Sequence, residues 1–140
     1  MTIELFNNHR HRRQVVNLWK TVFAYQEPRN NPDLVIDKKL TINDNLFFVS
    51  IDDNIVTGTV LAGYDGHRGW IYSLAVNPQR RLQGIGSKLL HHAEQKLLDR
   101  GCLKINLQIL PDNESIKNFY LKNGYKFEER ISMGKVISQS

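Results

Sequence analysis

The residues best suited to chemistry form one stretch, residues 77–87, which reads Asn-Pro-Gln-Arg-Arg-Leu-Gln-Gly-Ile-Gly-Ser. Gly84 and Gly86 allow backbone conformations that are closed to other residues, and they let a ligand approach the main chain. A helix is expected to begin at about Gly84, and the unpaired amides of a helix N-terminus, together with the helix dipole, attract an anion. The stretch therefore predicts a binding site for a pyrophosphate.

Two common nucleotide-binding motifs do not match this stretch. A Walker loop requires G-x-x-x-x-G-K-[ST], which is not present here. A dinucleotide fingerprint requires a third glycine where Leu89 stands, and an acidic residue about 20 positions further on, which is also missing. A tight strand-to-helix turn without any ligand remains an alternative on these residues alone.

Most of the excess positive charge of the chain lies beside the same stretch. The chain has 19 Lys and Arg against 14 Asp and Glu, a net charge of +5. Such a segment is either a solvated helix face or a site for a polyanion. Nucleic acid is disfavoured, because the segment lacks interleaved aromatic residues that stack on bases. Between residues 77 and 104 the basic residues are Arg80, Arg81, Lys88, Lys96, Arg100 and Lys104, and the acidic ones are Glu94 and Asp99.

A second segment, residues 113–125, completes the pattern. It reads Asn113-x-x-Ile116-x-x-Phe119-Tyr120-x-x-x-Gly124-Tyr125. Together with V-x-P and Arg81-x-x-Gly84-x-Gly86, it makes the chain resemble the GNAT family of acetyl-coenzyme A-dependent N-acetyltransferases between about residues 70 and 126. Within that family, the turn YDGHRG at residues 64–69 is similar to that of the bacterial YpeA-type acetyltransferases.

The resemblance implies a fold and a reaction. The fold is α/β (α+β): a mixed, mostly antiparallel sheet of six or seven strands, flanked by about four helices, with a splayed parallel strand pair that binds the coenzyme. It implies one domain over residues 1–140 with acetyl-CoA as cosubstrate. The acetyl group passes directly to a primary amine of a small molecule or a protein, without an acyl-enzyme intermediate. The alternative is a module that binds acyl-CoA as a sensor without turnover.

The resemblance also implies which residues bind the coenzyme. The amides of the glycine stretch hold the pyrophosphate, and the strand before it pairs with the pantetheine arm. One of these strand amides donates to the thioester carbonyl. An asparagine bonds the arm, although a plain helix N-cap is the alternative for it. The implied residues are Leu74, Ala75, Val76, Arg81, Leu82, Gln83, Gly84, Ile85, Gly86, Ser87 and Asn113.

The catalytic groups are implied only in part. Tyr120 corresponds to the general acid that protonates the departing thiolate, and a phenol with a pKa of about 10 can do this; a core aromatic is the alternative. The general base stays open among Asp65, His67, Tyr72 and a water-relayed group. Gln108 stands where ribosomal-protein N-terminal acetyltransferases of the family carry a glutamate base, which counts against that substrate class. The acceptor amine is not predicted.

Cysteine and histidine usage predicts neither a disulfide nor a metal site. Cys102 is the single cysteine, which suits a reducing cytoplasm, and it is expected to be buried. His91 and His92 are adjacent and face different directions on a helix, which is poor metal geometry. The sequence shows neither an apolar run of membrane-spanning length nor a signal-peptide core, so no membrane partner is expected. A homodimer stays open, because many relatives in the family dimerise.

The spacing of the apolar residues predicts the strands and helices that must position the candidate site residues. The strand–helix–strand unit from residue 70 to 110 predicts a right-handed crossover between parallel strands, with the glycine stretch after the first of them. The loops at 25–31 and 64–69 and the last strands are expected to set the acceptor. Strands are expected at 2–6, 46–51, 55–62, 70–76, 104–110, 126–131 and 133–137, and helices at 10–24, 32–40, 84–100 and 112–123.

Overall fold

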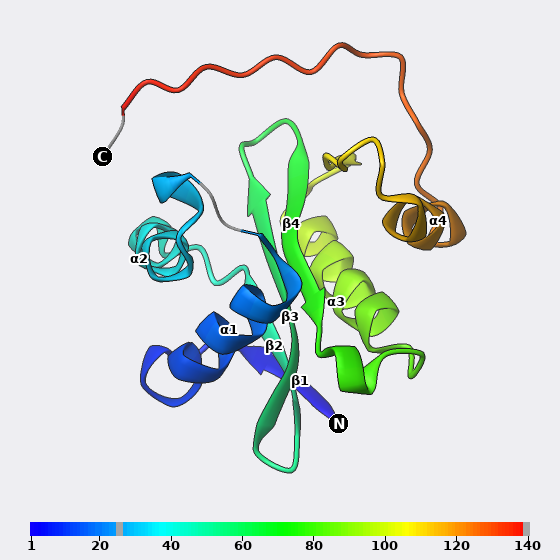
Figure 1. Ribbon diagram of the computed structural model, residues 1–140. Helices are drawn as coiled ribbons and strands as arrows, with labels where there is room; N and C mark the ends of the chain where they lie inside the picture. Colours follow the sequence, from blue (N-terminus) through cyan, green and yellow to red (C-terminus); the bar gives the residue numbers. More distant parts are fainter. Residues whose placement is uncertain (25–26, 139–140) are drawn as a thin grey trace. The chain divides into compact units, whose positions relative to one another are not determined.

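The computed structural model describes residues 1–24 and 27–138, which fall into two compact units, residues 1–107 and 108–140. Tyr25 and Gln26 of the expected acceptor loop lie outside the described residues. The first unit contains strands β1 (Thr2–Leu5), β2 (Phe47–Asp52), β3 (Ile55–Tyr64), β4 (Gly69–Val76) and β5 (Ile105–Asn106), and helices α1 (Asn8–Val22), α2 (Pro32–Ile42) and α3 (Ile85–Asp99). The second unit contains helix α4 (Glu114–Lys122) (Figure 1).

The sheet has the order β1-β2-β3-β4-β5, with three antiparallel pairings and a parallel pairing of β4 with β5. This confirms a mixed, mostly antiparallel sheet and the predicted parallel strand pair. Short 3₁₀ turns at Pro28–Asn30 and Pro78–Arg80 lie in the connecting loops. Asp53 and Asn54 form the β2–β3 turn with positive φ angles of 49° and 62°, as a tight two-residue hairpin turn requires.

The expected number of six or seven strands is wrong, because the described residues form five. The segment 104–110 pairs only over Ile105–Asn106. The segments 126–131 and 133–137 form no strand in the second unit, and their apolar side chains lie in solvent, with Ile131 92% and Met133 90% exposed. A segment of alternating apolar residues forms a strand only where a neighbouring strand supplies hydrogen bonds and where one face is buried.

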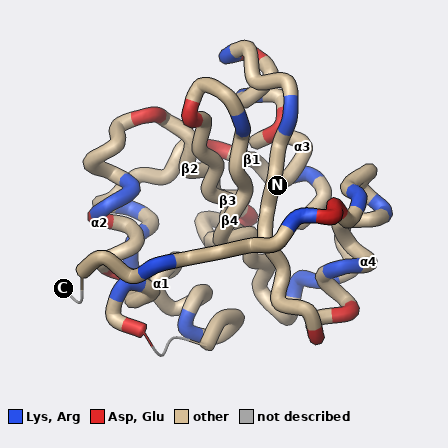
Figure 2. Tube along the Cα trace, turned by 90° about the horizontal axis from the view of Figure 1, so that it is seen from above, with Lys and Arg blue, Asp and Glu red and all other residues tan. Residues whose placement is uncertain are grey.

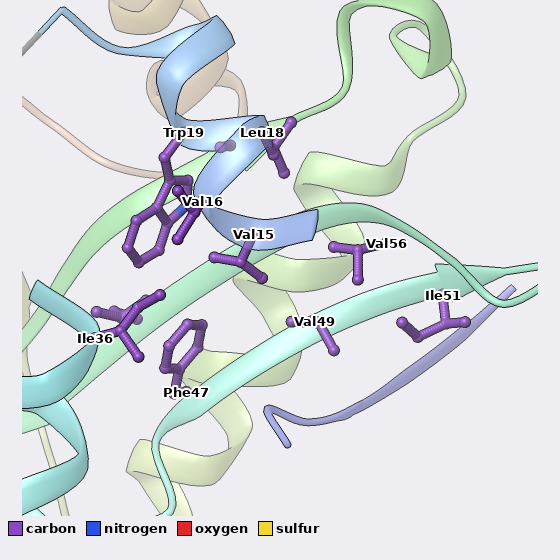
Figure 3. Close-up of a cluster of buried hydrophobic side chains, with 11 residues drawn as sticks. Val15, Val16, Leu18, Trp19, Ile36, Phe47, Val49, Ile51 and Val56 are labelled. Carbon is purple, nitrogen blue, oxygen red and sulfur yellow. The ribbon is translucent and has the colours of Figure 1, made fainter. Parts of the chain in front are cut away.

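Helices cover both faces of the sheet in the first unit. Helices α1 and α2 lie on one face and α3 lies on the other (Figure 1). Figure 3 shows the core under α1, where Val15 and Trp19 lie over Phe47 and Val49 of β2. Between these two strand residues, Phe48 points to the opposite face and contacts His92 of α3 edge-on, with ring centres 4.6 Å apart. Because side chains alternate between the two faces of a strand, β2 contributes residues to the packing on both sides of the sheet.

The helix ends are capped by asparagine side chains or followed by glycine. Asn31 caps α2 by accepting a hydrogen bond from the Asp33 amide at 3.0 Å. Gly101 follows α3 with a φ of 89°, a left-handed conformation that favours glycine. Asn7 caps α1 through the Arg10 amide, a cap that apolar spacing did not predict.

Two further expectations concern membranes and the cysteine. Within residues 1–24 and 27–138, no helix is both long and apolar enough to span a membrane. Cys102 is buried as predicted, and its thiol lies 3.3 Å from the carbonyl oxygen of Lys104.

His11 is a buried histidine on α1. Its Nδ1 accepts a hydrogen bond from the Asn7 amide at 2.9 Å, and its Nε2 has no hydrogen-bond partner among the described residues. Glu4 Oε1 lies 3.6 Å from that nitrogen. Burial, and secondly the charge of Arg10, lower the pKa of His11 below 6.5, so the folded protein holds this side chain neutral.

We therefore expect the free energy of unfolding to fall as the pH drops below 6.5. The unfolded chain takes up a proton at His11 before the folded chain does, so stability is lost on the acid side. In His11→Gln, this part of the pH dependence should disappear from urea unfolding curves measured between about pH 5 and pH 7. His92→Gln is the comparison, since burial and Lys96 lower the pKa of His92 too. This account would be contradicted if the free energy of unfolding changed with pH as steeply in His11→Gln as in the wild type.

Gly58 on β3 is a position where no side chain fits. An added Cβ would lie 2.8 Å from Leu89 Cδ1 of α3, and 2.9 Å from both the Ala75 carbonyl oxygen and Ser50 Oγ. We expect Gly58→Ala to lower the free energy of unfolding by about 1–3 kcal/mol, because the backbone oxygen and the packed helix must shift. Urea unfolding measures this, with Gly134→Ala as the control, where an added Cβ meets nothing within 4 Å. Equal stability of the two variants would contradict the close packing of α3 on β3.

Candidate functional site

Strand β4 has an edge that is unpaired over most of its length in the first unit. It pairs with β5 only at Gly69↔Ile105 and Trp70↔Asn106. From Ile71 to Val76, β4 stays paired with β3 on its other side, but no described strand of this unit pairs with its outer edge. An extended ligand can bind such an edge as an added strand, through backbone hydrogen bonds. Leu74, Ala75 and Val76 lie on this edge.

A β-bulge interrupts β4 just before these residues. The register with β3 shifts so that Ser73 and Leu74 together lie opposite Val60. Ser73 has a φ of 51°, a left-handed conformation that costs a non-glycine residue about 1–2 kcal/mol. Hydrogen bonds hold it there: Thr59 Oγ1 donates to the Ser73 carbonyl oxygen at 2.9 Å, and Trp19 Nε1 donates to Thr59 Oγ1 at 2.8 Å. Helix α1 therefore supports the bulge through β3.

The loop after β4 combines positive backbone angles with a helix N-terminus. Leu82 is fully exposed and has a φ of 66°, and Gly84 has a φ of 78°. Gly84 precedes α3 and offers no side chain to cap its first amides. The amides of Ile85 and Gly86 have no acceptor within the helix, as in the first turn of any helix. An anion placed there would meet backbone N–H groups and the positive end of the helix dipole.

The two arginines of this loop have different surroundings. Arg80 is half-buried and paired with Asp52, with Nη1 and Oδ2 2.6 Å apart. Arg81 is exposed. Figure 2 marks the basic residues along the chain. Lys88, in the first turns of α3, is also exposed. The positive charge that faces solvent beside the loop therefore comes from Arg81 and α3, while Arg80 links the loop to β2.

Asn113 and Tyr120 belong to the second unit. Asn113 caps α4, and its Oδ1 accepts a hydrogen bond from the Ile116 amide at 3.3 Å, so its role as a helix N-cap is confirmed. Tyr120 is buried and packs edge-on against Phe119 and Tyr125, with ring centres 5.1 and 5.4 Å away. Burial raises the pKa of Tyr120 to about 12, because the charged phenolate is disfavoured there. The phenol therefore keeps its proton throughout the neutral range.

Asp65 is a poor proton acceptor. Its carboxylate accepts hydrogen bonds from the Arg68 amide at 2.7 Å, the His67 amide at 2.8 Å and Trp70 Nε1 at 3.3 Å. These hydrogen bonds stabilise the charged form and lower its pKa, with the bond from Arg68 as the largest cause. Asp65 thus shapes the turn between β3 and β4. His67 is exposed in the same turn.

The hydroxyl of Tyr72 is directed toward β3. It lies 3.5 Å from Nζ of the buried Lys39, which also donates to Asp44 Oδ2 at 2.9 Å and to the Ala62 carbonyl oxygen. A Cβ added at Gly63 of β3 would lie 3.3 Å from the same hydroxyl. The hydroxyl therefore points away from the unpaired edge of β4, which disfavours Tyr72 as the base. Of the predicted candidates, His67 and water remain.

Sequence reasoning missed the residues that support the site. Ser73 belongs to a plain strand pattern, and the bulge that it forms with Leu74, itself a predicted coenzyme residue, becomes visible only in the register with β3. Trp19 and Thr59 look like core residues, although their polar atoms hold the bulge. Lys39 of α2 is buried, and its ammonium pairs with Asp44 in the loop after α2 and donates to the Ala62 carbonyl oxygen of β3.

The comparisons with known proteins agree with this architecture. The sequence profile described as "Acetyltransferase (GNAT) family" matches residues 12–125. The chain is similar to the PaiA N-acetyltransferase from Thermoplasma acidophilum in complex with coenzyme A, at 21% identity and a TM-score of 0.74, covering 94% of each chain. It is similar to glucosamine-6-phosphate N-acetyltransferase from Arabidopsis thaliana, at 18% identity and a TM-score of 0.71, covering 98% of each chain.

A third similar structure is the aminoglycoside antibiotic 6'-N-acetyltransferase from Acinetobacter haemolyticus. It shares 14% identity and a TM-score of 0.76, and the match covers 99% of this chain and 100% of that one. At such identities these structures support the fold alone. The family profile, in contrast, spans well over half of the sequence, from α1 to the residue after Gly124. The chain therefore belongs to the GNAT family of acetyltransferases.

Proposed function

We propose that this protein is an acetyl-CoA-dependent N-acetyltransferase that transfers the acetyl group directly to a primary amine. The observation that carries the proposal is the unpaired edge of β4, which leads directly into the anion-binding loop and the N-terminus of α3. A ligand with an extended arm that ends in a pyrophosphate fits an open strand edge followed by a helix N-terminus. The CoA-bound and N-acetyltransferase neighbours support the same reading.

In this proposal the backbone does most of the coenzyme binding. The amides of residues 82–87 hold the pyrophosphate, and exposed Arg81 adds a positive charge to it. The edge residues Leu74, Ala75 and Val76 pair with the pantetheine arm. The basic residues of α3 attract the remaining phosphate of the coenzyme.

The chemistry needs one hydrogen-bond donor and two proton transfers. An amide after the bulge donates to the thioester carbonyl, and it bonds more strongly to the oxyanion that forms when the amine attacks. Tyr120 donates its proton to the departing thiolate, a role that rests on its position in the family motif. Asn113 is proposed to bond the pantetheine arm, a role that, like that of Tyr120, rests on its position in the family motif. The acceptor loses its proton to water, or to His67 through water.

The subfamily, the acceptor class and the cellular compartment are proposed from the sequence alone. The turn at residues 64–69 favours a YpeA-type acetyltransferase, and Gln108 disfavours acetylation of ribosomal-protein N-termini. The single cysteine suits a reducing cytoplasm. A protein that binds acyl-CoA as a sensor without turnover is the alternative that the following experiment separates.

The test is an acceptor screen with acetyl-CoA, in which released thiol and acetylated amine are measured in the same reactions. The panel contains alkylamines, diamines, amino sugars and peptides with free N-termini. We expect thiol release that depends on one class of amine, with one acetylated amine formed for each thiol. Thermal stabilisation by acetyl-CoA without turnover on any amine supports the sensor instead. The absence of any stabilisation would contradict both.

A further inference from the structure

Two aromatic side chains on β4 form an exposed surface, which we call the aromatic shelf. Trp70 and Tyr72 are two residues apart, so they lie on the same face of the strand. Trp70 is 37% exposed and Tyr72 43% exposed, whereas Ile71 between them points to the other face and is buried. The shelf lies on the side of Leu61, which belongs to the core under α1 and α2. Large aromatic rings exposed side by side indicate a binding surface.

Polar contacts fix both rings. Trp70 Nε1 donates to Asp65 Oδ2 at 3.3 Å. Lys39 Nζ is 3.5 Å from the Tyr72 hydroxyl but 5.7 Å from the ring centre, so the ammonium lies beyond the hydroxyl end rather than over the ring face. The rings are held at their polar ends, and both side chains remain partly exposed. A ligand that binds them therefore has little side-chain entropy to remove.

The carboxylate that contacts the shelf, that of Asp65, favours a cation there. Asp65 is exposed and carries its charge at neutral pH, because three hydrogen bonds lower its pKa. Oδ2 accepts from the indole, and a carboxylate oxygen can accept a second hydrogen bond. The charge of Lys39 is balanced by Asp44, and Arg68 contacts the His67 carbonyl oxygen at 3.5 Å. An indole face next to an ionised carboxylate is a combination that attracts ammonium groups.

We infer that the aromatic shelf and Asp65 bind a second ammonium group of the acceptor, which makes the acceptor a long diamine or polyamine. The inference rests on the proposed function, since the first amine must react at the unpaired edge of β4. Leu74 lies four residue steps along the strand from Trp70, a span of about 13 Å that the bulge shortens. The acceptor chain must therefore span on the order of 10 Å between its two amines, given that strand rise.

The test compares two amines that differ only at the far end, 1,8-diaminooctane and octylamine. Wild-type kcat/KM for the diamine should exceed that for the monoamine by about tenfold, the size of a cation–π contact plus an exposed ion pair. Trp70→Leu and Asp65→Asn should each bring this ratio toward one. The thermal shift with acetyl-CoA should stay at its wild-type value in both, because neither residue contacts the coenzyme in this account.

Two control variants lie on the same hairpin. Tyr64→Phe removes a hydroxyl that contacts the carbonyl oxygens of Gly66 and Gly101, and it should leave the ratio unchanged. Arg68→Gln removes a nearby positive charge, so the ratio should stay the same or rise. Only a loss of selectivity confined to Trp70→Leu and Asp65→Asn fits a cation subsite.

Three outcomes overturn the inference. If the wild type uses octylamine as well as the diamine, the shelf does not recognise a cation. If the diamine is preferred and Trp70→Leu keeps that preference, the second ammonium binds elsewhere. A wild-type protein that is stabilised by acetyl-CoA but acetylates no amine in the full panel overturns the proposed function, and the inference with it.

Discussion

The Tyr120→Phe variant is expected to turn over about 10²–10⁴-fold more slowly than the wild type, the usual loss when a general acid is removed. The substitution removes one hydroxyl and keeps the ring that packs against Phe119 and Tyr125. The KM for acetyl-CoA should stay within a few-fold, because the lost interaction belongs to the transition state. Steady-state kinetics on the acceptor found in the screen measures both constants.

The pH profile gives an independent check of the same residue. With a pKa of about 12, the phenol of Tyr120 stays protonated up to alkaline pH. The wild-type rate should therefore show no decline due to Tyr120 between pH 7 and about pH 10, which is about two units below that pKa. Phe119→Leu is the control, since it changes the neighbouring ring and keeps the hydroxyl. Turnover of Tyr120→Phe near the wild-type rate would make Tyr120 a core residue.

The second large effect is expected at the start of α3. Gly86→Val should remove most of the thermal stabilisation that acetyl-CoA gives the wild type. Position 86 lies in the first turn of the helix, where a branched side chain covers the amides that the pyrophosphate needs. The fold should tolerate the change, because position 86 lies within α3 and valine is a weak helix former but not a helix breaker. Differential scanning fluorimetry across a titration of acetyl-CoA measures the effect.

Gly86→Ala is the matched control for that variant. Alanine adds one methyl group and should keep a large part of the stabilisation, so the loss should grow with side-chain size. An undiminished shift in Gly86→Val would place the pyrophosphate elsewhere. A melting temperature without ligand that stays near the wild-type value separates lost binding from lost folding.

Much of the first unit could be predicted from residue patterns. Helix α3 began within a residue of its expected start, because Gly84 and the apolar positions from Leu89 to Leu97 define it. The hairpin of β2 and β3 follows from two apolar runs around Asp53 and Asn54. These are local signals, in which neighbouring residues determine the backbone.

The predictions failed where structure depends on distant partners. Residues 126–137 alternate as a strand does, but no strand of the second unit pairs with them. The bulge at Ser73 depends on Thr59 and Trp19, which are 14 and 54 positions away by residue number. The direction of the Tyr72 hydroxyl depends on Lys39, which comes from another element. Such contacts cannot be predicted from the residues next to them in the sequence.

The most direct test of the account is amide hydrogen exchange in the presence and absence of acetyl-CoA. We expect slower exchange on binding at the amides of Leu74–Val76 that face the outer edge of β4 and at 82–87, because these amides donate to the coenzyme. Amides of β2 are paired on both sides within the sheet, so they should not change and serve as the internal reference. Acetyl-CoA that binds without slowing exchange at either segment would contradict the placement of the coenzyme on β4 and the loop after it.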